Sequence, residues 1–221
     1  MSSTACPVVL AAPSGTGKTT LAHRLVAGAG RYVFSVSATT RDPRAGDVDG
    51  TDYHFVDRTG FEAMVAGGEF VEWAEVHGRL YGTPRAELER AAARGEHVVL
   101  DIDVQGARQI KAKVPDAKLV FVLPPDVDTL MARLTGRGSE TPATVARRLR
   151  TSLQELQAVE DFDYVVVNDD LERCLDEIRD IVSGKVQAGS TNTAMEGART
   201  LRQAIVRILA EEYSEHTNAL P

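Results

Sequence analysis

The opening stretch of the chain constrains its fold more than any other part. Residues 8–12 form a short apolar run that stops at a glycine-rich turn, and residues 19–27 then have the pattern of a helix. A strand, a glycine loop and a helix in this order open many α/β nucleotide-binding domains. The sequence therefore predicts a buried first strand that leads into an anion-binding loop.

The turn between that strand and helix has the form of a phosphate loop. The candidate ATP-binding residues in it are Ala12, Pro13, Ser14, Gly15, Thr16, Gly17, Lys18, Thr19 and Thr20. Gly15 and Gly17 let the backbone curl so that successive N–H groups point at one anion. We expect Lys18 to reach the β and γ phosphates and the Thr19 hydroxyl to ligate Mg²⁺. Ala12 replaces the usual first glycine, where the loop mainly needs a small side chain. A chance match in a glycine-rich turn is the alternative, and the flanking strand and helix argue against it.

Three further apolar runs have the character of buried parallel strands. These runs are residues 97–103, 118–123 and 164–167, and the helical stretches among them are 84–94, 106–113, 126–134 and 171–182. The alternation predicts an α/β fold, with a P-loop NTPase-type parallel sheet and helices on both faces.

Two segments interrupt the alternation inside a predicted domain at residues 5–186. Residues 35–83 hold short strand-like pieces and turns and are interpreted as an inserted module, whereas 126–157 include a polar, arginine-rich helical part that suits a lid. The remaining core segments are 5–34, 84–125 and 158–186. Residues 187–221 comprise a polar linker and an amphipathic helix, which either docks on the core or pairs with another subunit.

Composition limits the partners that the chain can have. A formal net charge of −7 argues against broad nucleic-acid or membrane-surface binding. No apolar run is long enough to span a bilayer, and the first seven residues lack the pattern of a secretion signal, so the expected location is cytoplasmic. Cys6 and Cys174 show no metal-ligand spacing and are interpreted as reduced and structural.

A second anion site is predicted in the inserted module. Arg41 and Arg44 lie three residues apart, are held by Pro43 and are followed by Tyr53. Guanidinium groups donate bidentately to phosphate oxygens, so this pair suits one phosphate group, although solvated surface charge is the default for any single arginine. The Asn-Lys-x-Asp motif of switch GTPases is not matched by Asn168-Asp169-Asp170, which argues against that class.

Longer strings connect these sites to a known family. The string from residue 35 to 55, the pairs Glu72-Trp73 and Tyr81-Gly82, and the stretch from 100 to 106 form a specific signature. Over about residues 8–187 the chain resembles guanylate kinases, which phosphorylate GMP to GDP with ATP. The resemblance implies that the GMP phosphate and nearby groups would be held by Ser37, Arg41, Arg44, Tyr53 and Tyr81, and that the guanine base would be recognised by Glu72, Ser37 and Thr83.

The chemistry of guanine agrees with this assignment. Guanine presents its N1–H and N2–H donors side by side, and the carboxylate of Glu72 can accept both, whereas adenine presents an acceptor at N1. A site built around buried polar partners can reject the wrong base by about 10⁴-fold. Taken singly, Tyr53 and Tyr81 are equally well explained as half-buried aromatics and Glu72 as an exposed charge, so the assignment depends on their combined order and spacing.

Asp101 follows the apolar run 98–100 in the manner of a Walker B acid that orients Mg²⁺ and its waters. The resemblance also places Asp101 near GMP. Mg²⁺ is therefore the expected cofactor, with Thr19 as one ligand and Asp101 as another, directly or through water. Asp103 either joins this group or caps the following helix.

The resemblance also assigns the ATP side of the reaction. It implies that Arg137 and Arg148 fold over the ATP phosphates, with Arg147 as a less certain neighbour, and that Asn168 lies against adenine. The candidate catalytic residues are Lys18, Arg41, Arg137 and Arg148. A protein nucleophile is not needed, because a GMP phosphate oxygen attacks the γ phosphate in line.

Two rival functions remain at this point. A P-loop kinase with a sugar-phosphate acceptor is disfavoured by Glu72 and Thr83, which suit a base with two donors. An inactive guanylate-kinase-like module that binds a phosphorylated peptide is disfavoured by Lys18 and Thr19 and by the lid arginines. The sequence leaves open whether dGMP is accepted and whether the chain is a monomer or a homo-oligomer.

Overall fold

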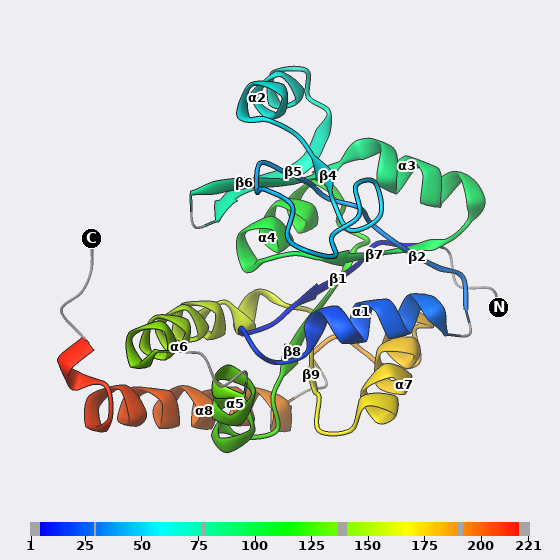
Figure 1. The fold of residues 1–221 in the computed structure, drawn as a ribbon. Coiled ribbons are helices and arrows are strands. Elements are labelled where there is room, and N and C mark those ends of the chain that lie inside the picture. Colours follow the sequence, from blue (N-terminus) through cyan, green and yellow to red (C-terminus); the bar gives the residue numbers. More distant parts are fainter. Residues whose placement is uncertain (1–4, 29, 77, 137–140, 190–191, 217–221) are drawn as a thin grey trace. The chain divides into compact units, whose positions relative to one another are not determined.

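The structure is a computed structural model (Figure 1). It describes residues 5–28, 30–76, 78–136, 141–189 and 192–216. These residues form two compact units. The first unit contains residues up to 9 together with 22–118, and the second contains residues 10–21 together with those from 119 onward.

The larger sheet among the described residues has five strands in the order β2-β7-β1-β8-β9. The strands are β1 (Val8–Ala11), β2 (Tyr32–Phe34), β7 (His97–Asp101), β8 (Lys118–Leu123) and β9 (Tyr164–Val167). Strand β2 pairs in parallel with β7, and β8 pairs in parallel with β9. The residues of β1 are all buried and those of β8 nearly all, as expected for strands covered on both faces. The predicted α/β fold with a parallel central sheet is thus confirmed.

Strand β2 was missing from the predicted set of strands. It has three residues, all half-buried, and it lies at one edge of the sheet. Three residues are too few to show an apolar run or an alternating pattern, which explains the omission. Strand β7 also ends earlier than predicted, at Asp101, because Asp103 begins the next helix instead.

A second sheet of four strands lies within the first unit, in the order β4-β3-β6-β5 among the described residues. Its strands are β3 (Ala38–Thr39), β4 (His54–Phe55), β5 (Phe70–Val76) and β6 (Arg79–Pro84). Ala38, Phe70 and Leu80 form a small core with Phe61 of helix α2 (Arg58–Ala66). This part of the chain therefore has a sheet and a core of its own, although the predicted module boundaries at 35–83 stay a prediction.

The first unit also contains α3 (Arg85–Arg94), α4 (Val104–Lys113) and residues 22–27 of helix α1 (Lys18–Ala27). Helix α4 begins at an N-cap, since the Oδ1 atom of Asp103 accepts a hydrogen bond from the backbone N–H of Gly106 at 2.8 Å. Of the two roles open for Asp103, the structure therefore gives it the capping role. Helix α4 packs against strand β5, as Figure 1 shows.

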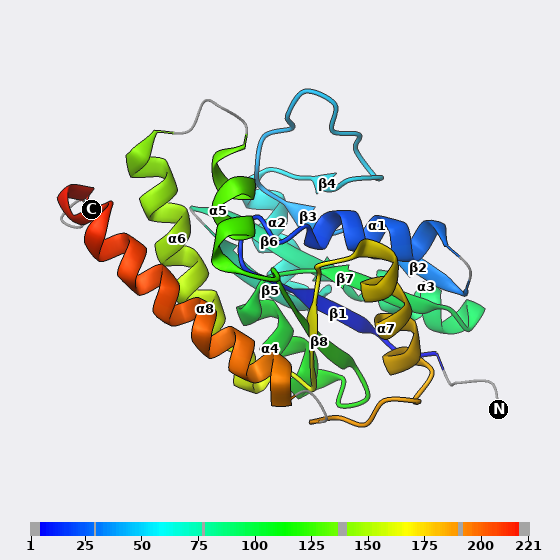
Figure 2. The same ribbon diagram turned by 90° about the horizontal axis from the view of Figure 1, so that it is seen from below.

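The second unit is mainly helical. Helix α1 (Lys18–Ala27) starts in it, and its other helices are α5 (Val127–Thr135), α6 (Pro142–Gln157), α7 (Leu171–Val182) and α8 (Asn192–Glu211). Helix α8 packs beside α6, with further contacts to α5 and β9 (Figure 2). Ala198, Leu201 and Ile205 are buried along it. The C-terminal helix thus docks on its own chain. No helix among the described residues is long and apolar enough to cross a membrane.

Candidate functional site

The phosphate loop has the curled backbone that its glycines predict. Gly15 and Gly17 have φ values of +88° and +91°, a region that side chains disfavour. Thr16 is completely buried, and its N–H and hydroxyl both donate to the carbonyl of Pro13, at 3.2 Å and 2.7 Å. A Cβ atom at Gly17 would lie 3.0 Å from the Nδ2 atom of Asn168. Both glycines are therefore required by conformation, and Gly17 also by a close approach.

Two side chains hold one peptide group of the loop. The carbonyl oxygen of Thr16 accepts hydrogen bonds from Arg133 Nη1 at 2.9 Å and from Asn168 Nδ2 at 2.8 Å. Two donors on one carbonyl fix the plane of the peptide that joins Thr16 to Gly17. Asn168 is buried in this position. Its contact with adenine stays a prediction. Arg133 lies in the segment 126–157 that was predicted to form a lid, but it was not assigned to the site.

Helix α6 brings two charged groups to the beginning of the loop. Arg148 donates from Nε and Nη2 to the Ser14 hydroxyl, at 3.3 Å and 3.1 Å, and from Nη1 to the carbonyl of Leu134. The carboxylate of Glu155 accepts the backbone N–H of Ser14 at 3.3 Å. Arg148 therefore lies against the phosphate loop, while its contact with ATP phosphates stays a prediction. Glu155 was missed, because 141 residues separate it from Ser14 and no motif includes it.

The remaining residues of the ATP side have simpler positions. Lys18 is the first residue of α1, and Thr19 and Thr20 follow it on the exposed surface. A helix N-terminus favours a bound anion, which suits this placement. Ala12 is 7% exposed, in agreement with the need for a small side chain there. Arg137 lies outside the described residues.

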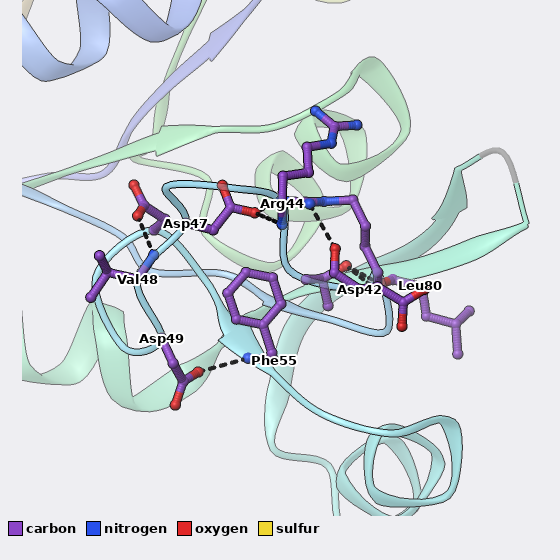
Figure 3. A network of polar contacts seen from close by, with 10 residues as sticks. Asp42, Arg44, Asp47, Val48, Asp49, Phe55 and Leu80 are labelled. Carbon is purple, nitrogen blue, oxygen red and sulfur yellow. Dashed lines mark hydrogen bonds and ion pairs between the residues drawn. The ribbon is translucent and has the colours of Figure 1, made fainter.

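On the predicted GMP side, Arg41 is held by several neighbours. Its Nη2 atom forms an ion pair with Asp47 Oδ2 at 2.8 Å, and its guanidinium lies 5.1 Å from the ring centroid of Tyr53 and 5.5 Å from that of Phe55. The backbone N–H of Arg44 donates to the same Asp47 oxygen at 2.7 Å, as Figure 3 shows. Asp47 therefore links both arginines of the predicted clamp. It lies inside the signature string 35–55 but was not assigned to the site from the sequence.

The two tyrosines of the predicted GMP site lie together. The ring centroids of Tyr53 and Tyr81 are 6.0 Å apart in an edge-to-face arrangement. Burial, followed by the negative charge of Asp101, raises the pKa of the Tyr53 hydroxyl. This phenol accordingly stays a proton donor at neutral pH, and Asp101 faces the same region. Ser37 is half-buried, and its carbonyl accepts the N–H of His54 at 2.9 Å.

Glu72 and Thr83 form the most unusual polar pair of this unit. They lie opposite each other on β5 and β6, and the Thr83 hydroxyl donates to Glu72 Oε1 at 2.6 Å. Glu72 is 4% exposed and Thr83 is fully buried. Burial raises the pKa of Glu72 to about 7, the nearby charge of Asp103 also raises it, and the Thr83 hydrogen bond and the Lys113 charge lower it. A carboxylate whose pKa lies this close to neutral pH is typical of a functional position.

A β-bulge helps to place Glu72. Phe70 pairs with Pro84 and Glu72 pairs with Thr83, so strand β5 carries one extra residue at Val71. Bulges redirect the side chains that follow them and are frequent beside functional sites. The sequence gives no signal for this bulge, whose position depends on the pairing with β6.

Comparisons with known proteins agree with the geometry. A model of the guanylate kinase family matches residues 4–185. The chain is 48% identical over 180 residues to a guanylate kinase of Rhodococcus jostii (strain RHA1), covering 80% of this chain and 87% of that protein. It is 43% identical over 207 residues to a guanylate kinase of Symbiobacterium thermophilum, covering 93% of each. The crystal structure of guanylate kinase from Anaplasma phagocytophilum is similar, with a TM-score of 0.68, 33% identity, and coverage of 92% of this chain and 96% of that one.

Proposed function

The chain belongs to the guanylate kinase family, and from this we propose that it transfers the γ-phosphate of ATP to GMP in a site that binds both nucleotides. The products are GDP and ADP. The observation that carries the proposal is the buried Glu72–Thr83 pair on a chain with a phosphate loop. We also propose a cytoplasmic location, which fractionation of cells tests.

We assign recognition of the base to Glu72. An ionised carboxylate offers about four acceptor positions, and the Thr83 hydroxyl uses one of them. Guanine N1–H and N2–H would supply donors to the others, whereas adenine would present an acceptor to the same carboxylate. Because Glu72 is buried, water cannot readily replace the missing donors, so the wrong base is rejected. Ser37 is the further residue assigned to this base.

The GMP phosphate is assigned to Arg41 and Arg44, with Tyr53 and Tyr81 as neighbouring hydroxyl donors. Asp47 keeps the Arg41 guanidinium oriented before the phosphate arrives. The position of Asp101 near Tyr53 fits a role beside this nucleotide.

Transfer of the phosphoryl group needs positioning and charge stabilisation more than a protein nucleophile. A GMP phosphate oxygen attacks the γ phosphorus as the bond to the β–γ bridging oxygen breaks. Lys18, the N–H groups of the loop, Arg148 and Arg137 would stabilise the developing charge. Closure of the segment 126–157 over ATP would exclude water and so suppress hydrolysis.

The residues present fit a Mg²⁺ ion. Mg²⁺ prefers oxygen ligands and is usually bound through one or two protein groups, substrate phosphates and waters. Thr19 offers a hydroxyl and Asp101 a carboxylate, so each is the right kind of donor. Bound Mg²⁺ would neutralise charge on the β and γ phosphate oxygens.

A coupled assay with ATP and each of GMP, dGMP, AMP, CMP and UMP tests the proposal. We expect turnover with GMP at least about 10³-fold above AMP in kcat/KM, because Glu72 faces an acceptor on adenine. Comparable turnover of AMP and GMP, or no turnover of any monophosphate, would overturn it. The arm with dGMP decides whether the ribose 2′-hydroxyl contributes.

A further inference from the structure

Among the described residues, strand β5 lies at an edge of its sheet, and helix α4 contacts it there. The bulge at Val71 leaves backbone groups beside Glu72 that strand β6 does not pair in a regular ladder. Backbone donors and acceptors at such an edge need partners. Here side chains of α4 supply them at the residues on both sides of Glu72.

Gln109 binds both backbone groups of Trp73. Its Nε2 atom donates to the Trp73 carbonyl at 2.8 Å, and its Oε1 atom accepts the Trp73 N–H at 3.4 Å. A side-chain amide thus replaces a neighbouring strand at the residue directly after Glu72. On the other side, Lys113 Nζ donates to the Val71 carbonyl at 2.5 Å. The peptide groups that flank Glu72 are therefore both tied to one helix.

Gly106 sets how closely that helix approaches Glu72. A Cβ atom at Gly106 would lie 2.7 Å from Glu72 Oε2 and 3.1 Å from Glu72 Cδ. No real Cβ atom approaches a carboxylate oxygen so closely, so the carboxylate would have to move if position 106 carried a side chain. The N–H of Gly106 meanwhile donates to the N-cap Asp103, which fixes the first turn of α4.

Satisfying the backbone groups at the edge of β5 would not by itself require hydrogen bonds from side chains of α4. The two hydrogen bonds between Gln109 and the Trp73 backbone lie at an exposed position, so water could satisfy the same backbone groups. What water cannot do is fix the direction in which the Cα–Cβ bond of Glu72 points. A displacement of about 1 Å at a binding group can cost about 100-fold in rate.

We infer that helix α4 positions Glu72 for guanine, with Gln109 as a specificity-determining positioning residue and Gly106 as the spacer that lets the carboxylate stay in place. The inference rests on the proposed function, since it concerns the same base-recognition site. Neither residue touches substrate in this account. Both act through the carboxylate.

Gln109→Ala is the first test, with Gln105→Ala as the matched control, because Gln105 is an exposed glutamine one turn earlier on the same helix. We expect Gln109→Ala to raise KM and the calorimetric Kd for GMP by about tenfold, with the ATP KM and kcat at saturating GMP within about threefold of wild type. The preference for GMP over IMP, which lacks the 2-amino group, should fall by a similar factor. Gln109→Glu retains the length of the side chain and an acceptor for the Trp73 N–H. It should therefore weaken GMP binding less than Gln109→Ala does.

Gly106→Ala is the second variant, chosen because alanine is the better helix former and the fold should survive. We expect a larger rise in GMP Kd than for Gln109→Ala, and a thermal midpoint no lower than about 5 °C below wild type. The emission of Trp73, the only tryptophan of the chain, reports whether β5 stays in place.

The outcomes separate the two proposals. If wild type fails to phosphorylate GMP, the proposed function is wrong. If wild type works and Glu72→Gln loses GMP selectively, while Gln109→Ala and Gly106→Ala keep wild-type GMP and IMP constants, the positioning role of α4 is wrong and the function stands. A uniform loss for GMP and ATP in both variants would also overturn the positioning role.

Discussion

The phosphate loop and the proposed guanine pocket are built in opposite ways. The loop is one continuous segment that presents backbone N–H groups, and its shape depends on two glycines with positive φ. The proposed guanine pocket involves β5, β6 and α4, and its central group is the buried side-chain carboxylate of Glu72. One site thus offers neutral donors from the main chain, whereas the other offers an acceptor whose charge depends on pH.

This difference has consequences for how each site responds to change. Backbone donors do not titrate near neutral pH, so binding at the loop should follow the ionisation of ATP itself. The pKa of Glu72 lies at about 7, so its acceptor strength changes within the physiological range.

Arg148→Ala should lower turnover by about 10³-fold, because Arg148 lies on Ser14 of the loop and is assigned to charge on the transferring phosphoryl group. Steady-state kinetics at saturating ATP and GMP measure this. The Kd for GMP serves as the internal control and should not change, since the guanine pocket is built from other residues. Near-normal turnover would contradict the assignment.

The GMP affinity of the wild type should rise about tenfold between pH 6 and pH 8. In the proposed function, Glu72 accepts both guanine donors only when it is ionised, so protons should compete with GMP as the pH falls through about 7. Asp103 and Lys113, the charged groups that face Glu72, act on its pKa in opposite directions. Calorimetry across this range gives the profile.

Glu72→Gln is the control for that profile, because its pH dependence keeps only the second ionisation of the GMP phosphate, near pH 6. Thr83→Val should move the wild-type midpoint to higher pH, since it removes a hydrogen bond that lowers the pKa of Glu72. An identical profile in wild type and Glu72→Gln would show that Glu72 does not titrate on GMP binding.

The pH dependence of the free energy of unfolding should report the ionisation of Glu72 in the absence of any ligand. The folded-state pKa of Glu72 lies above its ordinary value, so its contribution to stability is complete at low pH and is lost as the pH rises through about 7. Glu72→Gln removes this loss. We expect the free energy of unfolding of the variant to exceed that of wild type by up to about 3 kcal/mol at pH 8, and by much less at pH 5. Urea unfolding at both pH values measures the difference.

Asp47→Asn should have the smallest effect. Asparagine retains an acceptor for the Arg44 N–H but loses the ion pair with Arg41, which lies near the surface. We expect the KM for GMP to rise about threefold, because Arg41 is less well oriented. A fall in KM would mean instead that Asp47 competes with the GMP phosphate for Arg41.

The contrast between the two sites also explains what the sequence could predict. The loop was predictable because its glycines, Lys18 and the flanking strand and helix are contiguous, and local backbone geometry leaves few alternatives. The assignment of Glu72 came from the resemblance, and its burial and raised pKa needed the structure. Asp103 was left between two roles, and the N-cap geometry decided between them.

Contacts between distant segments could not be predicted. Gln109 meets Trp73 across 36 residues, and Glu155 meets Ser14 across 141. Neither residue has a motif or an unusual neighbourhood in the sequence. The bulge at Val71 and the edge strand β2 depend on pairing partners in the same way.

The most direct test of the account is a paired measurement of the Kd for GMP and for ATP in wild type and Glu72→Gln at pH 8, with Glu75→Gln as control. Glu75 lies on the same strand and is exposed. We expect Glu72→Gln to weaken GMP binding by about 100-fold or more and to leave ATP binding unchanged, while Glu75→Gln should alter neither. Equal losses for GMP and ATP, or an unchanged Kd for GMP, would contradict the claim that Glu72 recognises guanine.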